Sequence, residues 1–140
     1  MVLRGQRGWF LTSFYETSSG MLVKGIGMEI IEKEKLIELR ELSNGSDDLI
    51  KTLLDKYIVN TQGFIEQINA ALAAKDYEKV LFGVHTVKGS SLSLGLITLG
   101  QKFTELNARA KAGDYKNFEF EMASISLLLK DVISYRATLG

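Results

Sequence analysis

The sequence predicts an all-α fold, an antiparallel up-and-down four-helix bundle with an additional short N-terminal helix. The 140-residue chain contains no proline, the residue that most strongly interrupts helices. After residue 45, apolar residues recur every three or four positions in four long segments, which is the spacing of an amphipathic helix. The connections between these segments are short. Consecutive helices should therefore run in opposite directions and bury their apolar faces against one another.

The first expected helix spans residues 29–42 and is rich in charged side chains. We expect it to cover one end of the bundle. Asn44 and Gly45 predict a turn after it, and Ser46 or Asp47 can cap the helix that follows.

The second and third expected helices carry long apolar stripes. Asp76 is a natural N-cap for the third helix, which should end near Gly95. The stripe of the second helix consists of Leu49, Leu53, Leu54, Tyr57, Phe64, Ile65, Ile68 and Leu72. The stripe of the third consists of Tyr77, Val80, Leu81, Val84 and Val87.

The fourth expected helix ends at Gly113, and Asp114 is the expected N-cap of the last helix. Its apolar face consists of Leu96, Leu99, Phe103, Leu106 and Ala110. The last helix carries Phe118, Met122, Ile125, Leu128, Leu129, Val132 and Tyr135. We expect residues 29–140 to form the bundle. Residues 1–28, which contain five glycines, should form a loosely ordered extension.

The composition argues against several classes of function. The 17 basic and 17 acidic residues cancel, so no net field favours nucleic acid or an anionic membrane. No cysteine is present, and one histidine makes a zinc site implausible, so we expect no metal. No apolar run reaches the roughly 18 to 20 residues that span a bilayer. The absence of cysteine also fits a reducing compartment, and we expect a cytoplasmic protein.

The single histidine, His85, falls at the edge of the apolar stripe of the third expected helix. Lys88 follows three residues later and can bend its ammonium group toward the ring, while Gly89 leaves space one turn beyond the imidazole. An anionic phosphoryl group would fit both the charge and the space. The same residues also fit a solvated histidine without chemistry and a glycine at a close helix crossing.

The segment HTVKGSSLSLG, residues 85–95, resembles the signature of histidine phosphotransfer domains. The positions that match in register are His85, Val87, Lys88, Gly89, Ser90, Ser91, Leu94 and Gly95. The resemblance extends over roughly residues 30–138. It implies a four-helix bundle that exposes a phospho-acceptor histidine on one helix, in agreement with the apolar spacing.

The resemblance implies that His85 receives a phosphoryl group from the receiver domain of a hybrid sensor histidine kinase. His85 would then pass the group to the receiver domain of a response regulator. Lys88 would stabilise the phosphoryl charge, and Mg²⁺ would belong to the receiver alone. The protein would be a monomeric phosphocarrier without a cofactor, and not an enzyme, since no G-x-x-x-x-G-K-[ST] loop for ATP is present.

Four further residues are expected at this site. Many members of the family have glutamine or glutamate at the position of Asn107 and arginine at the position of Lys111. Asn107 could donate a hydrogen bond to the phosphoryl group and Lys111 could add charge, although both could simply be solvated. Phe82 and Leu92 are expected to be partly exposed and to dock the receiver. Core packing is the alternative for both.

Two other functions remain open. One is a helical module that binds a receiver without transferring phosphate. The other is an unrelated dimeric scaffold assembled through the aromatic N-terminal residues Trp9, Phe10, Phe14 and Tyr15.

Overall fold

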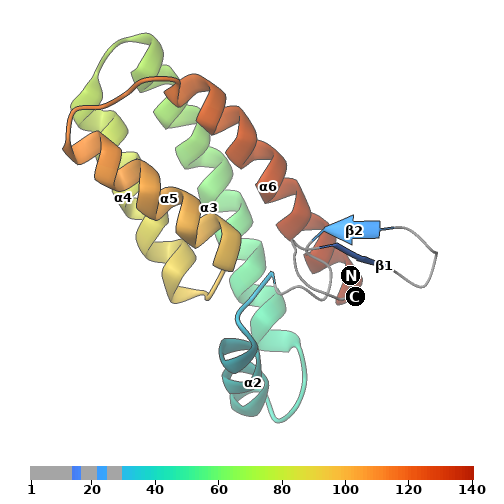
Figure 1. Ribbon diagram of the computed structural model, residues 1–140. Helices are drawn as coiled ribbons and strands as arrows, with labels where there is room; N and C mark the ends of the chain where they lie inside the picture. The colour runs from blue at the N-terminus through green and yellow to red at the C-terminus, as the bar shows by residue number, and fades with distance from the viewer. Residues whose placement is uncertain (1–13, 17–21, 25–29) are drawn as a thin grey trace. The chain divides into compact units, whose positions relative to one another are not determined.

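The structure is a computed structural model that describes residues 14–16, 22–24 and 30–140 (Figure 1). The chain divides into two units, Met1–Ile30 and Ile31–Gly140. In the first unit, strand β1 (Phe14–Glu16) pairs antiparallel with β2 (Leu22–Lys24), with Tyr15 opposite Val23. The rest of the expected loose extension lies outside the described residues, so the loose order expected of residues 1–28 stays a prediction.

The second unit is all-α, as the sequence predicts. Figure 1 shows four long helices packed side by side and one shorter helix that precedes them. Helix α3 contacts α4 and α6, and α5 contacts the same two neighbours, which makes a closed four-helix bundle. The short helix α2 contacts α3. The helices are α2 (Lys33–Leu42), α3 (Asp48–Ala73), α4 (Tyr77–Ser93), α5 (Ile97–Lys111) and α6 (Phe118–Thr138).

Most residues of the predicted apolar stripes form the core of the bundle, with Phe103 and Phe118 among the largest buried side chains. The stripe residues that are only partly buried are Leu49, Leu53, Phe64, Leu81, Leu128 and Tyr135. Tyr77 of the third stripe is 40% exposed and stacks on Tyr115 with ring centroids 4.2 Å apart. This stacking covers the end of the core where α4 begins.

Several helix ends are confirmed. The Asp76 carboxylate accepts a hydrogen bond from the Lys79 backbone N–H at 3.3 Å and caps α4. Gly95 follows α4 with φ +74°, and Gly113 follows α5 with φ +76°. A left-handed residue after a helix lets the chain turn sharply, which glycine permits without strain.

The expected N-cap of the last helix is wrong. Helix α6 begins at Phe118, and Asn117 occupies the N-cap position with φ +60°. Asp114 instead accepts a hydrogen bond from the Lys116 backbone N–H at 3.1 Å and pairs with Arg109 at 3.3 Å. Because the carboxylate is used within the turn, the helix starts after that turn is complete.

The first helix also begins later than predicted. Ile31 forms an isolated antiparallel bridge with Leu96, and the Glu32 backbone N–H donates to the Gly95 carbonyl at 2.8 Å. These residues are extended because they pair with the turn between α4 and α5, so α2 starts only at Lys33.

The start of α3 differs from the prediction in its capping bonds. Asp47 holds the N-cap position, but its carboxylate pairs with Arg40 at 2.8 Å and makes no capping bond. The Ser46 hydroxyl accepts from the Asp48 N–H at 3.3 Å, and the Ser43 hydroxyl accepts from the Leu49 N–H at 3.2 Å.

Candidate functional site

His85 is exposed on the outer side of α4, while its neighbours Val84 and Val87 are buried in the core. Successive residues of a helix are rotated by about 100°, which turns the imidazole away from the buried stripe. Within the described part of the chain, His85 makes no hydrogen bond or ion pair. The ring is therefore available to a reagent that approaches from solvent.

Lys88 and Gly89 lie one turn beyond His85 on the same helix. The Lys88 side chain is half-buried and has no acidic partner among residues 30–140. A Cβ atom built at Gly89 would meet nothing within 4 Å. Gly89 therefore does not mark a close helix crossing, and the space that the sequence suggested beside the imidazole is open.

The two serines after Gly89 have structural roles. The Ser90 hydroxyl donates to the Val87 carbonyl at 3.1 Å, within α4. Ser91 is fully buried and shares a 2.7 Å hydrogen bond with the Tyr57 hydroxyl of α3. Burial raises the pKa of Tyr57 above its usual value, partly offset by this hydrogen bond. The segment from His85 to Gly95 thus includes a residue, Ser91, that links α4 to α3.

Asn107 lies at the same height as His85, on the neighbouring helix. Leu92 contacts the position of Gly100, since a Cβ built there would lie 2.9 Å from the Leu92 Cδ2 atom. His85 precedes Leu92 by seven residues and Asn107 follows Gly100 by seven, so in antiparallel helices they reach the same level. Tyr77 lies eight residues before His85, and Tyr115 lies eight residues after Asn107. The stacking of these two tyrosines agrees with this alignment.

The side chain of Asn107 is almost completely buried, with only 4% of its surface exposed. Its Oδ1 atom is the one buried side-chain polar atom without a hydrogen-bond partner among the described residues. Such an orphaned group costs about 1–3 kcal/mol, which is unusual enough to need an explanation. Lys111 is exposed at the last position of α5, one turn beyond Asn107. The structure shows no contact between either residue and His85.

Phe82 and Leu92 are both exposed, at 64% and 52%, so neither is an ordinary core residue. Phe82 precedes His85 by one turn, and its ring lies against Phe64 with centroids 6.4 Å apart. Leu92 follows His85 by two turns on nearly the same side of α4. These exposures satisfy what docking requires, while docking itself stays a prediction.

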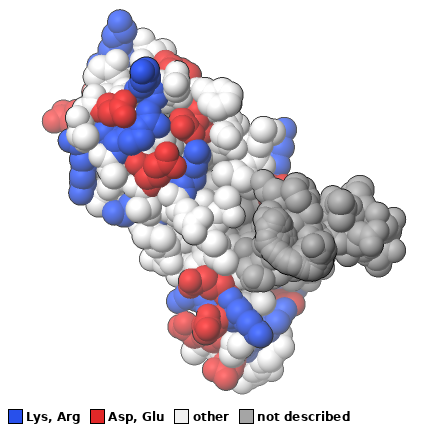
Figure 2. All heavy atoms as spheres, in the orientation of Figure 1, with Lys and Arg blue, Asp and Glu red and all other residues white. Residues whose placement is uncertain are grey.

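A network of charges that sequence reasoning missed ties α5 to α6. Glu121 pairs with Lys102 at 2.6 Å and with Arg109 at 3.3 Å, and Arg109 also lies over the Phe118 ring at 5.1 Å. Figure 2 shows positive and negative side chains interspersed where α5 ends and α6 begins, and again over α2, with few between. On this face, neither sign dominates.

The structure shows no other obvious centre for chemistry in the ranges it describes. Residues 14–16, 22–24 and 30–140 contain no group of three or more His, Cys, Asp or Glu that could hold a metal ion. None of the described helices combines the length and the apolarity of a membrane-spanning segment.

Comparison with known proteins defines the class to which this fold and site belong. The family model of the Hpt domain matches residues 52–135, more than half of the chain. The chain therefore belongs to the Hpt domain family, whose members are phosphocarriers that transfer phosphate through a histidine and interact with receiver domains.

A solved structure supports the same fold. The chain is similar to histidine-containing phosphotransfer protein B from Pseudomonas aeruginosa PAO1, with a TM-score of 0.70. The two share 21% sequence identity, and the similarity covers 79% of this chain and 93% of the other. No curated protein matches the chain.

Proposed function

We propose that this protein carries a phosphoryl group on His85 between receiver-domain aspartates of a two-component phosphorelay. The donor would be the receiver of a hybrid sensor histidine kinase and the acceptor the receiver of a response regulator. The observation that supports this proposal is the exposed imidazole on α4, with Lys88 one turn away and open space at Gly89.

The chemistry is a reversible exchange between a carboxylate and an imidazole. The Nε2 atom of His85 attacks the phosphorus of a phospho-aspartate, while Nδ1 keeps its proton. The new N–P bond forms as the P–O bond to the aspartate breaks, and the aspartate leaves as a carboxylate. A carboxylate of the second receiver then attacks the phosphorus and releases the imidazole. The receiver supplies Mg²⁺ for both steps.

The residues around His85 stabilise charge on the phosphoryl oxygens. Phosphoryl transfer has a loose transition state whose charge lies on the equatorial oxygens, so alignment and cationic stabilisation matter most. Lys88 supplies a positive charge from the same helix. Asn107 lies level with His85, and its NH₂ group would donate to a phosphoryl oxygen if its nearly buried side chain turns toward the imidazole. Lys111 adds a weaker, solvent-screened charge.

Phosphate transfer from a labelled receiver domain tests the proposal. Receiver domains phosphorylated with radioactive phosphate are mixed with the wild-type protein and with the His85→Gln variant. We expect wild type alone to gain a label that is lost in acid and kept in base, as phosphohistidine is. Circular dichroism should show the same helix content in both proteins, because the imidazole lies outside the core. A label that persists in His85→Gln would overturn the proposal.

A further inference from the structure

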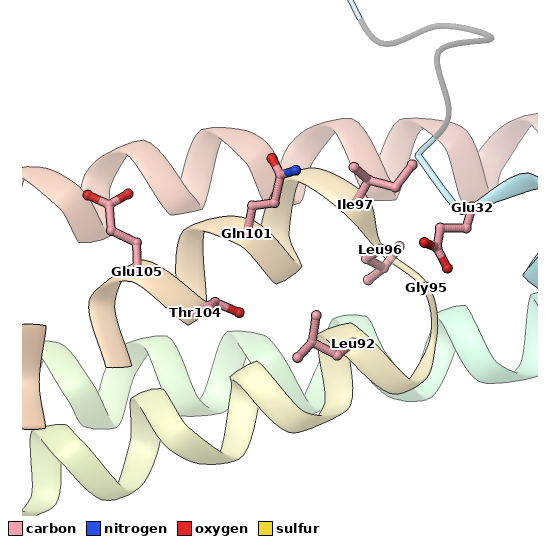
Figure 3. Close-up of a pocket in the computed structure, with 8 residues that line it drawn as sticks. All are labelled: Glu32, Leu92, Gly95, Leu96, Ile97, Gln101, Thr104 and Glu105. Atoms are coloured by element: carbon pink, nitrogen blue, oxygen red, sulfur yellow. The ribbon is translucent and has the colours of Figure 1, made fainter. Parts of the chain in front are cut away.

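A groove about 440 Å³ in volume lies at the end of the bundle where α4 turns into α5 (Figure 3). Its lining combines an apolar part with polar and acidic side chains. Figure 3 shows Glu32 at one end and Glu105 at the other, with Leu92 between them. The lining residues are Glu32, Leu92, Gly95, Leu96, Ile97, Gln101, Thr104 and Glu105.

One residue of the groove, Leu92, lies on the same helix as His85. Seven residues of α-helix place Leu92 about 10 Å from His85 along α4, on nearly the same side. A protein interface of standard size covers about 800 Å² of each partner, equivalent to a disc of about 16 Å radius. A receiver whose aspartate reaches His85 therefore also covers Leu92, and the far end of the groove, at Gly95 and Glu32, lies near the edge of such an interface.

The charges of the groove are poorly compensated by the protein itself. Glu105 is 55% exposed, and Lys102 lies 3.9 Å from it but only 2.6 Å from Glu121. Glu32 makes no ion pair with any described residue, and its side chain does not cap α2. Two carboxylates thus remain available at the two ends of an apolar surface.

The shape and charge of the groove would complement a segment that carries an apolar side chain between two basic ones. Ile97 and Glu105 are eight residues apart, so the groove extends about 12 Å along α5, too far for one side chain to reach both ends. The exposed Leu92 and the neighbouring Leu96 and Ile97 favour an apolar side chain in the middle. Each carboxylate favours a lysine or arginine at its own end.

We propose that this groove selects the cognate receiver by binding a segment that presents an apolar side chain between two basic ones. The proposal rests on the proposed function, since it assigns the groove to the receiver that phosphorylates His85. The basic residues pair with Glu32 and Glu105, and the apolar residue lies over Leu92. Receivers with acidic residues at the matching positions are rejected by repulsion.

The double variant Glu32→Gln/Glu105→Gln tests the groove. The probe is the receiver domain that binds the wild-type protein most tightly, titrated in its unphosphorylated form by calorimetry. We expect the double variant to bind about fivefold more weakly than wild type and to lose most of the salt dependence of Kd. Glu119→Gln is the matched control, because Glu119 is an exposed acid in the first turn of α6, beyond the other end of α5. This control should bind as wild type does.

A charge exchange identifies the contact. Lysines and arginines of the receiver are changed singly to glutamate, and each variant is titrated with wild type and with Glu105→Lys. We expect one basic residue of the receiver whose change to glutamate weakens binding to the wild-type protein. The same change should restore binding to the Glu105→Lys variant.

The outcomes separate the groove from the proposed function. Equal Kd values for wild type and the double variant, together with normal labelling of His85, would overturn the groove alone. Binding that weakens as expected in the double variant, without any labelling of His85 in wild type, would overturn the proposed function and leave the groove as a receiver-binding surface.

Discussion

Lys88 is the only cation that the helix itself brings within one turn of His85. Its ammonium group has no acidic partner among residues 30–140, so no ion pair within the bundle neutralises its charge. Because its stem is half-buried, the side chain has less freedom of movement than a fully exposed lysine. These properties make its role at the site directly measurable.

We expect Lys88→Ala to slow phosphate transfer to His85 by about ten- to a hundredfold without abolishing it, because one stabilising charge is lost. The rate is measured by rapid quench with a labelled receiver in excess. Lys130→Ala is the control, since Lys130 is exposed on α6 and should leave the rate unchanged. Equal rates in the Lys88→Ala variant and wild type would remove Lys88 from the site.

The hydrogen bond between Tyr57 and Ser91 offers a second residue-scale prediction. Tyr57→Phe leaves the buried Ser91 hydroxyl without its 2.7 Å partner, which should lower the free energy of unfolding by about 1–3 kcal/mol. Adding Ser91→Ala removes the orphaned group and should recover part of that loss. Urea unfolding of the two single variants and the double variant measures the coupling. Strictly additive effects would show that the bond contributes no stability.

The sequence predicted that His85 and Lys88 lie near each other, but it did not predict the hydrogen bond between Tyr57 and Ser91. The spacing of His85, Lys88 and Gly89 along one helix, with the family resemblance, was enough to predict their neighbourhood. Tyr57 and Ser91 lie on different helices, and their contact depends on how far α3 is shifted along α4. That register is set by the packing of whole apolar faces, so no local pattern could reveal it.

Helix α4 contains two interior glycines, Gly83 and Gly89, that have different surroundings. Gly89 faces open space, whereas a Cβ atom at Gly83 would lie 2.6 Å from the Ile68 Cγ1 atom of α3. Gly83 therefore lets α3 and α4 approach closely. The sequence drew attention to Gly89 because of its neighbours and gave no sign that Gly83 is the packing glycine.

We expect Gly83→Ala to lower the free energy of unfolding by about 1–3 kcal/mol, because Ile68 or a helix backbone must shift. Gly63→Ala is the matched control, since its added methyl group would meet nothing within 4 Å and alanine favours helix by about 1 kcal/mol. Thermal unfolding should therefore move the two variants in opposite directions. A Gly83→Ala protein as stable as the control would show that the crossing is not tight.

Helix boundaries were predicted well where a local signal acts alone. The capping by Asp76 and the turns at the glycines after α4 and α5 depend only on residues of the same segment. The signal at Asp114 was misread because Arg109, five residues earlier, competes for its carboxylate. The start of α2 was predicted too early because Ile31 pairs with Leu96, a residue far along the chain.

At the scale of the whole bundle, Asp55 of α3 and Arg136 of α6 join the two longest helices. The Arg136 guanidinium donates to both oxygens of Asp55, at 2.7 and 3.2 Å. The hydrogen bond from Arg136 holds the pKa of the Asp55 carboxyl below its usual value. A lowered folded-state pKa means that the pair stabilises the fold above the unfolded pKa and loses this effect as pH falls.

We expect the free energy of unfolding of the wild-type protein to decrease as the pH falls below about 4. In the Asp55→Asn variant, this free energy should fall less steeply over the same pH range. Urea titrations between pH 3 and pH 7 measure the slope. The effect should be small and should weaken with salt, because both groups are exposed to solvent. Glu119→Gln, which removes an acid that makes no ion pair with the described residues, should keep the wild-type slope. An unchanged slope in Asp55→Asn would contradict the prediction.

The class and topology of the bundle were predictable because they depend on apolar spacing, the absence of proline and short connections. Each stripe, such as the one from Leu96 to Ala110, could be predicted from a single segment of the sequence. The groove between Glu32 and Glu105 could not, because it joins residues more than seventy positions apart. The contact of Leu92 with Gly100 has a similar origin, since it depends on how α4 and α5 are aligned.

The bridge between Ile31 and Leu96 also constrains how the chain folds while it is being made. Translation delivers Ile31 first, and its partner follows 65 positions later. At about 5–20 residues per second, roughly 3–13 s pass before Leu96 leaves the ribosome. During that interval the bridge cannot form, so α2 can contact only α3, which is synthesised before Leu96.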